Sequence, residues 1–154
     1  PTPTTRDTLS LHDALPIYGH IFSTERVGRR LVAACVGGEL HEIGVRMVAD
    51  FFEMEGWDTY YLGANTPPES VVRTVAERRP DILGISATMT FHVREAARLI
   101  EWVRASEVGR AVRILIGGYP FNVAPELWRQ VGADGNARDA QAAVQLANQM
   151  VRAT

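Results

Sequence analysis

Apolar runs alternate with amphipathic segments along most of this chain, and this alternation constrains the fold more than any other feature. Short runs rich in valine, isoleucine, leucine and alanine are each followed by a segment with helical periodicity. The expected strands cover residues 30–36, 57–62, 81–86, 112–116 and 133–134, and the expected helices cover residues 41–55, 67–79, 91–105, 124–131 and 137–152. Strands separated by helices pair in parallel through right-handed crossovers. The predicted fold is therefore α/β, a flavodoxin-like doubly wound sheet of five parallel strands between two helical layers.

The composition is typical of a single globular domain. The chain has 154 residues, a formal net charge of −2 and 46% hydrophobic residues, so it can bury one core. The small net charge offers no electrostatic basis for binding nucleic acid. No apolar run reaches the roughly 18 residues of a membrane span, and no signal-peptide pattern is visible, so we expect a cytoplasmic protein without a membrane contact. Cys35 is the single cysteine, expected to be buried, and one cysteine excludes an intramolecular disulfide.

Residues 1–17 do not share this pattern. Proline, threonine and serine are crowded there without helical or strand periodicity, and the stretch TLSLHDALPI resembles translated sequencing-adapter read-through. His12 and Asp13 would then carry no information about function. Residues 18–30 predict a short helix like the last helix of a longer unit. We expect a non-native-looking or disordered tail at 1–17, the stump of a helical-bundle domain at 18–29 and a folded domain at 30–154.

The first strand is followed by an acidic residue, a histidine and a glycine at fixed spacing. In a doubly wound sheet, ligands bind beyond the carboxyl ends of the strands, where this loop lies. Glu39 precedes His41 by two residues and Gly44 follows by three. A carboxylate that holds one ring nitrogen sets the tautomer and basicity of a metal-binding imidazole, and imidazole suits a transition metal. A lone histidine in such a place is more often a solvated residue at the start of a helix, so this loop alone does not decide the function.

Two further loops at the same edge carry small residues. The loop after the third strand holds Ser86, Thr88 and Thr90, whose small side chains would leave a slot between the sheet and the helices; Thr90 is also expected to cap the next helix. Gly117 and Gly118 follow the fourth strand and allow close approach of a ligand or another backbone.

Several nucleotide and phosphate functions are disfavoured at this edge. No glycine-rich dinucleotide or phosphate-binding motif follows any expected strand. A receiver domain would need a phospho-accepting aspartate at the end of the third strand, where Ser86 stands.

The order Glu-x-His-x-x-Gly, Ser-x-Thr and Gly-Gly resembles the cobalamin-binding domain of corrinoid proteins, over about residues 30–153. The resemblance implies that the nucleotide tail leaves the cobalt and enters the slot, while His41 becomes the lower axial ligand. The cofactor would be adenosylcobalamin, methylcobalamin or hydroxocobalamin; haem or another tetrapyrrole on His41 is the alternative. The cofactor-binding residues that the resemblance implies are Glu39, Gly44, Ser86, Thr88, Thr90, His92, Gly117, Gly118, Tyr119, Asp134, Gly135 and Ala137.

Glutamate at position 39 and the stretch SATMTFH resemble light-sensing, adenosylcobalamin-dependent transcriptional regulators. Methyl-carrying corrinoid proteins have aspartate at 39, leucine at 88 and serine at 92. In the regulators a helical bundle caps the upper face, and His20 matches a capping histidine that could bind cobalt there. We therefore expect a non-catalytic sensory or regulatory module, a photoreceptor, that acts with an upstream bundle or an output domain and forms homo-oligomers. The alternative is the methyl-carrier module of a cobalamin-dependent methyltransferase, whose partner is a catalytic domain.

Overall fold

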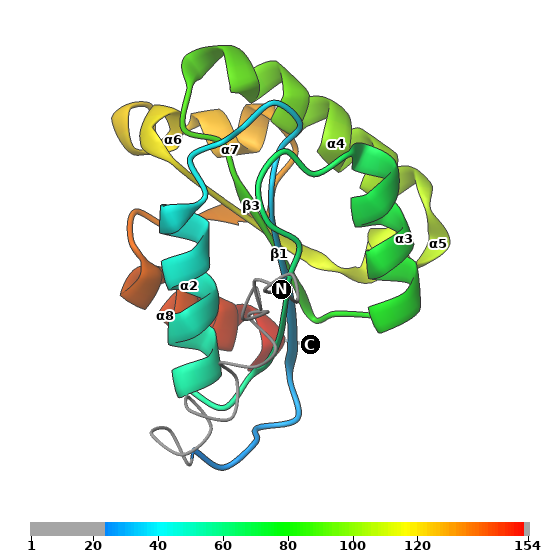
Figure 1. Ribbon diagram of the computed structural model, residues 1–154, viewed down its shortest axis with the longest axis vertical. Coiled ribbons are helices and arrows are strands. Elements are labelled where there is room, and N and C mark those ends of the chain that lie inside the picture. The colour runs from blue at the N-terminus through cyan, green and yellow to red at the C-terminus, as the bar shows by residue number, and fades with distance from the viewer. Residues whose placement is uncertain (1–23, 153–154) are drawn as a thin grey trace, which may run out of the picture.

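The structure, a computed structural model, describes residues 24–152 and forms three layers (Figure 1). The central sheet has five parallel strands in the order β2-β1-β3-β4-β5. Its strands are β1 (Arg30–Cys35), β2 (Asp58–Tyr61), β3 (Ile82–Ser86), β4 (Arg113–Gly117) and β5 (Gly135–Asn136). The prediction of a flavodoxin-like five-stranded α/β fold is confirmed.

Helices cover both faces of this sheet (Figure 1). On one face lie α2 (Ile43–Met54) and α8 (Ala140–Arg152), which contact each other; on the other lie α3 (Pro68–Arg78) and α4 (Val93–Ala105). Shorter elements complete the chain: a 3₁₀ helix η1 (Thr90–His92), α5 (Glu107–Ala111), α6 (Tyr119–Val123) and α7 (Leu127–Gln130). Within residues 24–152 no helix is long and apolar enough to cross a membrane.

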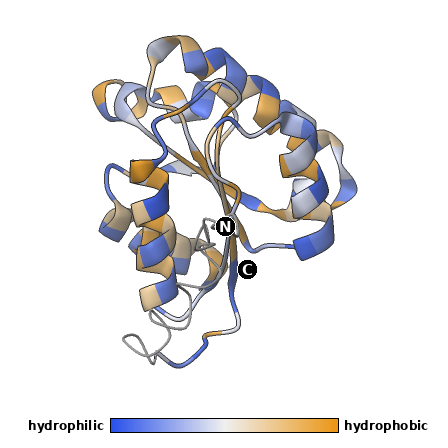
Figure 2. Ribbon diagram, viewed as in Figure 1, coloured by the Kyte–Doolittle hydropathy of each residue, from blue (hydrophilic) through white to orange (hydrophobic). Residues whose placement is uncertain are grey.

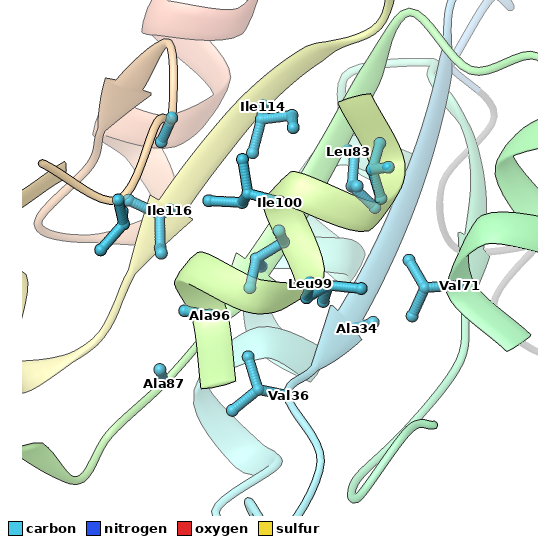
Figure 3. Packing of buried hydrophobic residues seen from close by; sticks show 14 of the residues in the cluster. Ala34, Val36, Val71, Leu83, Ala87, Ala96, Leu99, Ile100, Ile114 and Ile116 are labelled. Atoms are coloured by element: carbon cyan, nitrogen blue, oxygen red, sulfur yellow. The ribbon is translucent and has the colours of Figure 1, made fainter. Parts of the chain in front are cut away.

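Alternate residues of β1, β3 and β4 supply two separate cores. On β1, Val32 and Ala34 face α3 and α4, whereas Leu31 and Ala33 face α2 and α8. Figure 3 shows part of the first core, in which side chains from the sheet meet Leu99 and Ile100 of α4. All of Leu31–Cys35 is buried because the sheet is covered on both faces, which explains its unbroken apolar sequence. In Figure 2 the hydrophobic colours follow the inner strands, and hydrophilic residues lie on the outer sides of the helices.

Residues 24–29 are not helical, which corrects part of the helix expected over 18–30. They run along the end of α2 instead: Thr24 Oγ1 donates to the Met54 carbonyl at 2.8 Å, and Val27 N donates to the Gly56 carbonyl at 3.0 Å. These bonds to a distant segment satisfy backbone groups that a helix would have paired locally. The rest of the expected helix, with His20, lies outside the described residues.

Local details of the other elements also differ from expectation. Thr66, which would be the natural N-cap of α3, instead donates its hydroxyl to the Gly63 carbonyl at 3.0 Å, and Pro67 occupies the cap position. Thr90 does not cap α4; it begins η1. The helix expected at 124–131 is reduced to α7, and both α6, which precedes it, and α5 were not expected.

Gly118 holds the loop after β4 close to the loop after β3. It has a φ of 116°, and a Cβ at this position would collide with the backbone carbonyl of Ala87. Nearby, Ala87 N donates to the Gly117 carbonyl at 3.1 Å. Only glycine satisfies both the conformation and the close approach.

We expect Gly118→Ala to lower the free energy of unfolding by about 2 kcal/mol or more, because it adds a backbone collision to the strain of a left-handed residue. Urea unfolding followed by circular dichroism measures the change. Gly132→Ala is the matched control, since Gly132 has a φ of 85° and its added Cβ would lie 3.4 Å from Ile100 Cγ2. Equal losses in the two variants would contradict the collision.

Candidate cofactor-binding site

A cavity of about 650 Å³ opens at the carboxyl edge of the sheet, between the sheet and helices α2 and α8. Its floor on the sheet is built from small residues: Ala33 of β1 lies next to Gly84 of β3 in the strand register. A Cβ added at Gly84 would lie 3.6 Å from Leu31 Cδ1 and 4.0 Å from Ala33 Cβ, which is ordinary van der Waals contact. The slot predicted from small residues on the loops therefore extends down the face of the sheet.

Glu39 lies under the mouth of this cavity as a fully buried carboxylate with four hydrogen bonds. Oε1 accepts from His41 N at 2.8 Å and from His41 Nδ1 at 2.6 Å. Oε2 accepts from Thr88 N at 2.6 Å and from His92 Nδ1 at 3.0 Å. Two backbone N–H groups and two imidazoles thus surround one acid, and this network joins the loops that follow β1 and β3.

These hydrogen bonds decide the charge of Glu39. Burial would raise the pKa of its carboxyl, but the N–H groups of His41 and Thr88, with the two imidazoles, lower that pKa to about 2. The carboxylate is therefore ionised at neutral pH and acts as an acceptor toward both rings. His41 must then carry its proton on Nδ1, which leaves the lone pair on Nε2.

The two histidines differ in exposure. The side chain of His41 is 63% exposed at the cavity mouth, whereas that of His92 is 8% exposed. His41 can therefore present Nε2 to a ligand, and His92 holds Glu39 from behind. The sequence analysis placed both histidines at the cofactor site, with His41 as the metal ligand.

Asn65, which the sequence analysis missed, holds the same loop from the side of β2. It adopts a φ of 46°, which is rare for a residue other than glycine. Its Oδ1 accepts from Gly38 N at 2.7 Å, and its N donates to the Glu39 carbonyl at 2.8 Å. Asparagine after glycine and alanine in a loop signals such a turn, since asparagine tolerates this conformation. Glu42 ties a second point of this loop to β2, because its Oε2 accepts from Tyr61 Oη at 2.8 Å.

Cys35 is buried as expected, close to the His41 carbonyl. Burial, with the neighbouring charges of Glu39 and Glu42, raises the pKa of its thiol to about 12. The thiol is therefore an apolar part of the second core and not a reactive group.

Most of the cofactor-binding residues implied by the resemblance lie at this cavity. Those that line it are His41, Gly44, Ser86, Thr88, Gly117, Gly118, Tyr119 and Ala137. Gly44 has no positive φ, and a Cβ there would meet nothing within 4 Å. Packing within the chain therefore does not require glycine at this position, whereas close approach of a ligand would.

Asp134, Gly135 and Thr90 are not brought to the cavity. Asp134 Oδ2 accepts from Arg104 Nη2 at 2.6 Å and from Ile114 N at 2.7 Å, so its carboxylate is committed to the fold. Gly135 lies under α8, where a Cβ would be 3.0 Å from Leu146 Cδ2. Thr90 is exposed on η1 outside the lining. Asp134 and Gly135 therefore have packing roles within the chain, and their contact with the cofactor stays a prediction.

The side chains at this site suit a metal ion that is already held by a macrocycle and needs few protein ligands. In the part of the chain that the structure describes, no group of three or more histidine, cysteine, aspartate or glutamate side chains could hold a bare ion. A corrin ring supplies four equatorial nitrogens, so cobalt in such a ring needs only axial ligands from the protein. One oriented imidazole at the mouth of the cavity fits this requirement.

Comparison with known proteins decides the family. The domain described as "B12 binding domain" matches residues 29–145. The chain belongs to this family. Its cofactor is therefore cobalamin, as predicted, and the haem alternative has no support.

Relatives that match are corrinoid proteins. A corrinoid protein from Desulfitobacterium hafniense is 31% identical over 123 residues, which cover 79% of this chain and 56% of the relative. Dimethylamine corrinoid protein 2 from Methanosarcina acetivorans is 28% identical over 79% of this chain and 55% of the relative. The structure of a cobalamin-binding protein from Desulfitobacterium hafniense aligns with a TM-score of 0.75 at 27% identity, over 80% of this chain and 59% of that protein. The chain thus spans little more than half the length of these relatives.

These relatives show that the predicted light-sensing regulator, a photoreceptor, is wrong, because the matching proteins are corrinoid proteins that include dimethylamine corrinoid proteins. The error has a physical cause. At position 39 either acid can supply a carboxylate, and Thr88 reaches Glu39 through its backbone N–H, which leucine would also offer. Glu39 and Thr88 therefore do not discriminate between the two groups, whereas His92 contacts Glu39 through its side chain. The names of these relatives describe corrinoid proteins, in line with the expectation of a cofactor-binding domain.

We expect acid to weaken the fold through Glu39. Since its pKa is about 2 in the folded chain and 4.5 for an unperturbed glutamate, its stabilisation is complete above pH 4.5 and is lost as the pH falls toward 2. The loss is on the order of 3 kcal/mol. Urea unfolding of the cofactor-free protein between pH 5 and pH 2.5 measures it. Glu39→Gln should be less stable at pH 5 and should lose less on acidification; parallel curves for the two proteins would contradict the network.

Proposed function

We propose that this domain binds cobalamin with its nucleotide tail displaced from the cobalt, uses His41 as the lower axial ligand, and serves as a methyl carrier for methyltransferase partners. The observation that carries the proposal is the exposed imidazole of His41, held through Nδ1 by buried Glu39 at the mouth of the slot. The names of the relatives support the carrier role, since they include dimethylamine corrinoid proteins.

The chain prepares His41 for this role before any cofactor arrives. Glu39 accepts the Nδ1 proton, and this hydrogen bond orients the ring and makes Nε2 a stronger donor to a metal. Thr88 N and His92 Nδ1 fix Glu39 in turn, so the acceptor that orients the His41 ring is itself held in place. The lower ligand is therefore preorganised by the loops after β1 and β3.

The cavity accommodates the displaced tail. Ser86 and Thr88 lie on the β3 side of its mouth, and Gly117, Gly118 and Tyr119 lie on the β4 side. Gly117 and Gly118 have no side chains, so a planar base can approach the backbone there closely. Gly44 at the start of α2 leaves room on the remaining side.

A bound corrinoid supplies cobalt that can take up a methyl group and give it away. The chain holds this cofactor at the carboxyl edge of the sheet, where His41 is exposed and partners can reach it. The enzymes that add and remove the methyl group would be separate domains or proteins, so we propose a methyltransferase as the partner, without direct binding to nucleic acid.

The carrier role is tested with the protein loaded with methylcobalamin that carries a radioactive methyl group. In an extract of the cells that produce it, we expect label to leave the protein when a methyl acceptor is added. His41→Ala should slow this transfer by at least about 10-fold, because the lower ligand and its network are lost. Glu77→Gln on exposed α3 is the matched control and should transfer label at the wild-type rate. Label that stays on the wild-type protein, or leaves both variants at one rate, would contradict the proposal.

A further inference from the structure

The depth of the slot can be followed along the strands. Ser86 and Gly117 pair at the mouth, Ala33, Gly84 and Leu115 lie one level below, and Leu31 lies lowest among the lining strand residues. At about 3.3 Å per residue, the four steps along the strand from Cys35 down to Leu31 span about 13 Å. A planar base can therefore enter well below the mouth.

Below the mouth, the slot offers no polar side chain among the residues that the structure describes. Its lower walls are Val45, Val48 and Phe52 of α2, Ala143 of α8, and Leu31 and Leu115 of the sheet. The polar lining side chains stand on loops at the carboxyl edge or at the helix starts that face it, such as Ser86, Thr88, Asn122 and Arg138. The strand backbones are paired with each other in the parallel ladders, so they present no free groups to the slot.

From this lining we infer that the slot selects among corrinoids by the base of the tail, admitting bases without polar edge groups and disfavouring purines. The inference rests on the proposed entry of the tail into the slot. Benzimidazole has an apolar six-membered edge that can lie against Phe52, Leu31 and Leu115. Adenine has the same bicyclic shape, but its exocyclic amine and ring nitrogens would lose water in the slot without gaining a partner.

The expected difference in affinity between the two tails follows from the cost of burying a polar group without a hydrogen-bond partner. A site that leaves a buried polar group unpaired discriminates strongly against the ligand that carries it, whereas small changes of apolar size discriminate weakly. We expect the adenine tail to bind about 10- to 100-fold more weakly than the benzimidazole tail. The shared bicyclic frame removes ring size as the cause.

The test uses three cobalt corrinoids: benzimidazolylcobamide, adeninylcobamide, and cobinamide, which lacks the base. Spectral titration of the whole chain gives each dissociation constant. Each value is corrected for the tendency of the free cobamide to release its own base, which a pH titration without protein supplies. The ratio of the cobinamide constant to each cobamide constant is then the contribution of that tail. We expect a contribution for benzimidazole that exceeds the one for adenine by about 10-fold or more.

A variant pair tests whether the slot is responsible. Ala33→Ser places one hydroxyl on the floor of the slot and should narrow the difference between the two bases several-fold. Ala34→Ser is the matched control, because Ala34 is equally buried on the same strand but faces α3 and α4. Ala34→Ser should leave the ratio between the benzimidazole and adenine contributions unchanged. Circular dichroism checks that both variants fold.

The outcomes separate this inference from the proposed function. If both bases contribute strongly and equally to affinity, the proposed selectivity is wrong, but entry of the tail into the slot is supported. No contribution from either base would overturn tail entry, and the selectivity with it. A difference that Ala33→Ser and Ala34→Ser change alike would show that the slot does not cause it, which also overturns the inference.

Discussion

The buried carboxylate of Glu39 is the interaction on which the rest of the site depends. Burial of an ionised carboxylate costs folding free energy unless its oxygens accept hydrogen bonds. Here two backbone N–H groups and two imidazoles donate those hydrogen bonds. One consequence is the low pKa of Glu39, which keeps it an acceptor. The other is geometric, because the donors come from loops after β1 and β3, and Asn65 adds a hold from the loop after β2. The position of His41 is thus set by the carboxyl edge of the sheet as a whole.

The cofactor slot is the counterpart of this network. Ala33 and Gly84 are small residues side by side on the floor of the cavity, which has a volume of about 650 Å³. A cavity in an apolar core costs stability, so the chain without cofactor gives up packing that a bound tail would restore. Binding of cobalamin should then stabilise the fold by mass action as well as complete the site. The loosely packed slot would therefore leave room for the tail of the cofactor, while the hydrogen bonds of Glu39 position His41.

The sequence predicted those features that depend on local patterns. Strand and helix alternation indicated the sheet, and the spacing of Glu39 and His41, with the small residues after the other strands, identified the cavity. The sequence did not predict the role of a residue whose hydrogen-bond partners lie far away along the chain. Asp134 looked like a turn residue at the rim, but Arg104, 30 residues away, takes its carboxylate into the fold. Asn65 was missed because its partners lie on another loop. The assignment to light sensing rested in part on Thr88, which joins the network through its backbone N–H, so its side chain says nothing about the class of protein.

The identity of the axial nitrogen is the central claim, and electron paramagnetic resonance of the cobalt(II) form tests it most directly. A single nitrogen ligand splits the cobalt lines into three when it is ¹⁴N and into two when it is ¹⁵N. Protein made with ¹⁵N-labelled histidine and loaded with unlabelled cobalamin should show the two-line pattern, because His41 has replaced the base of the tail. A three-line pattern in the labelled protein would mean that the base of the tail still binds the cobalt, and this would contradict the account.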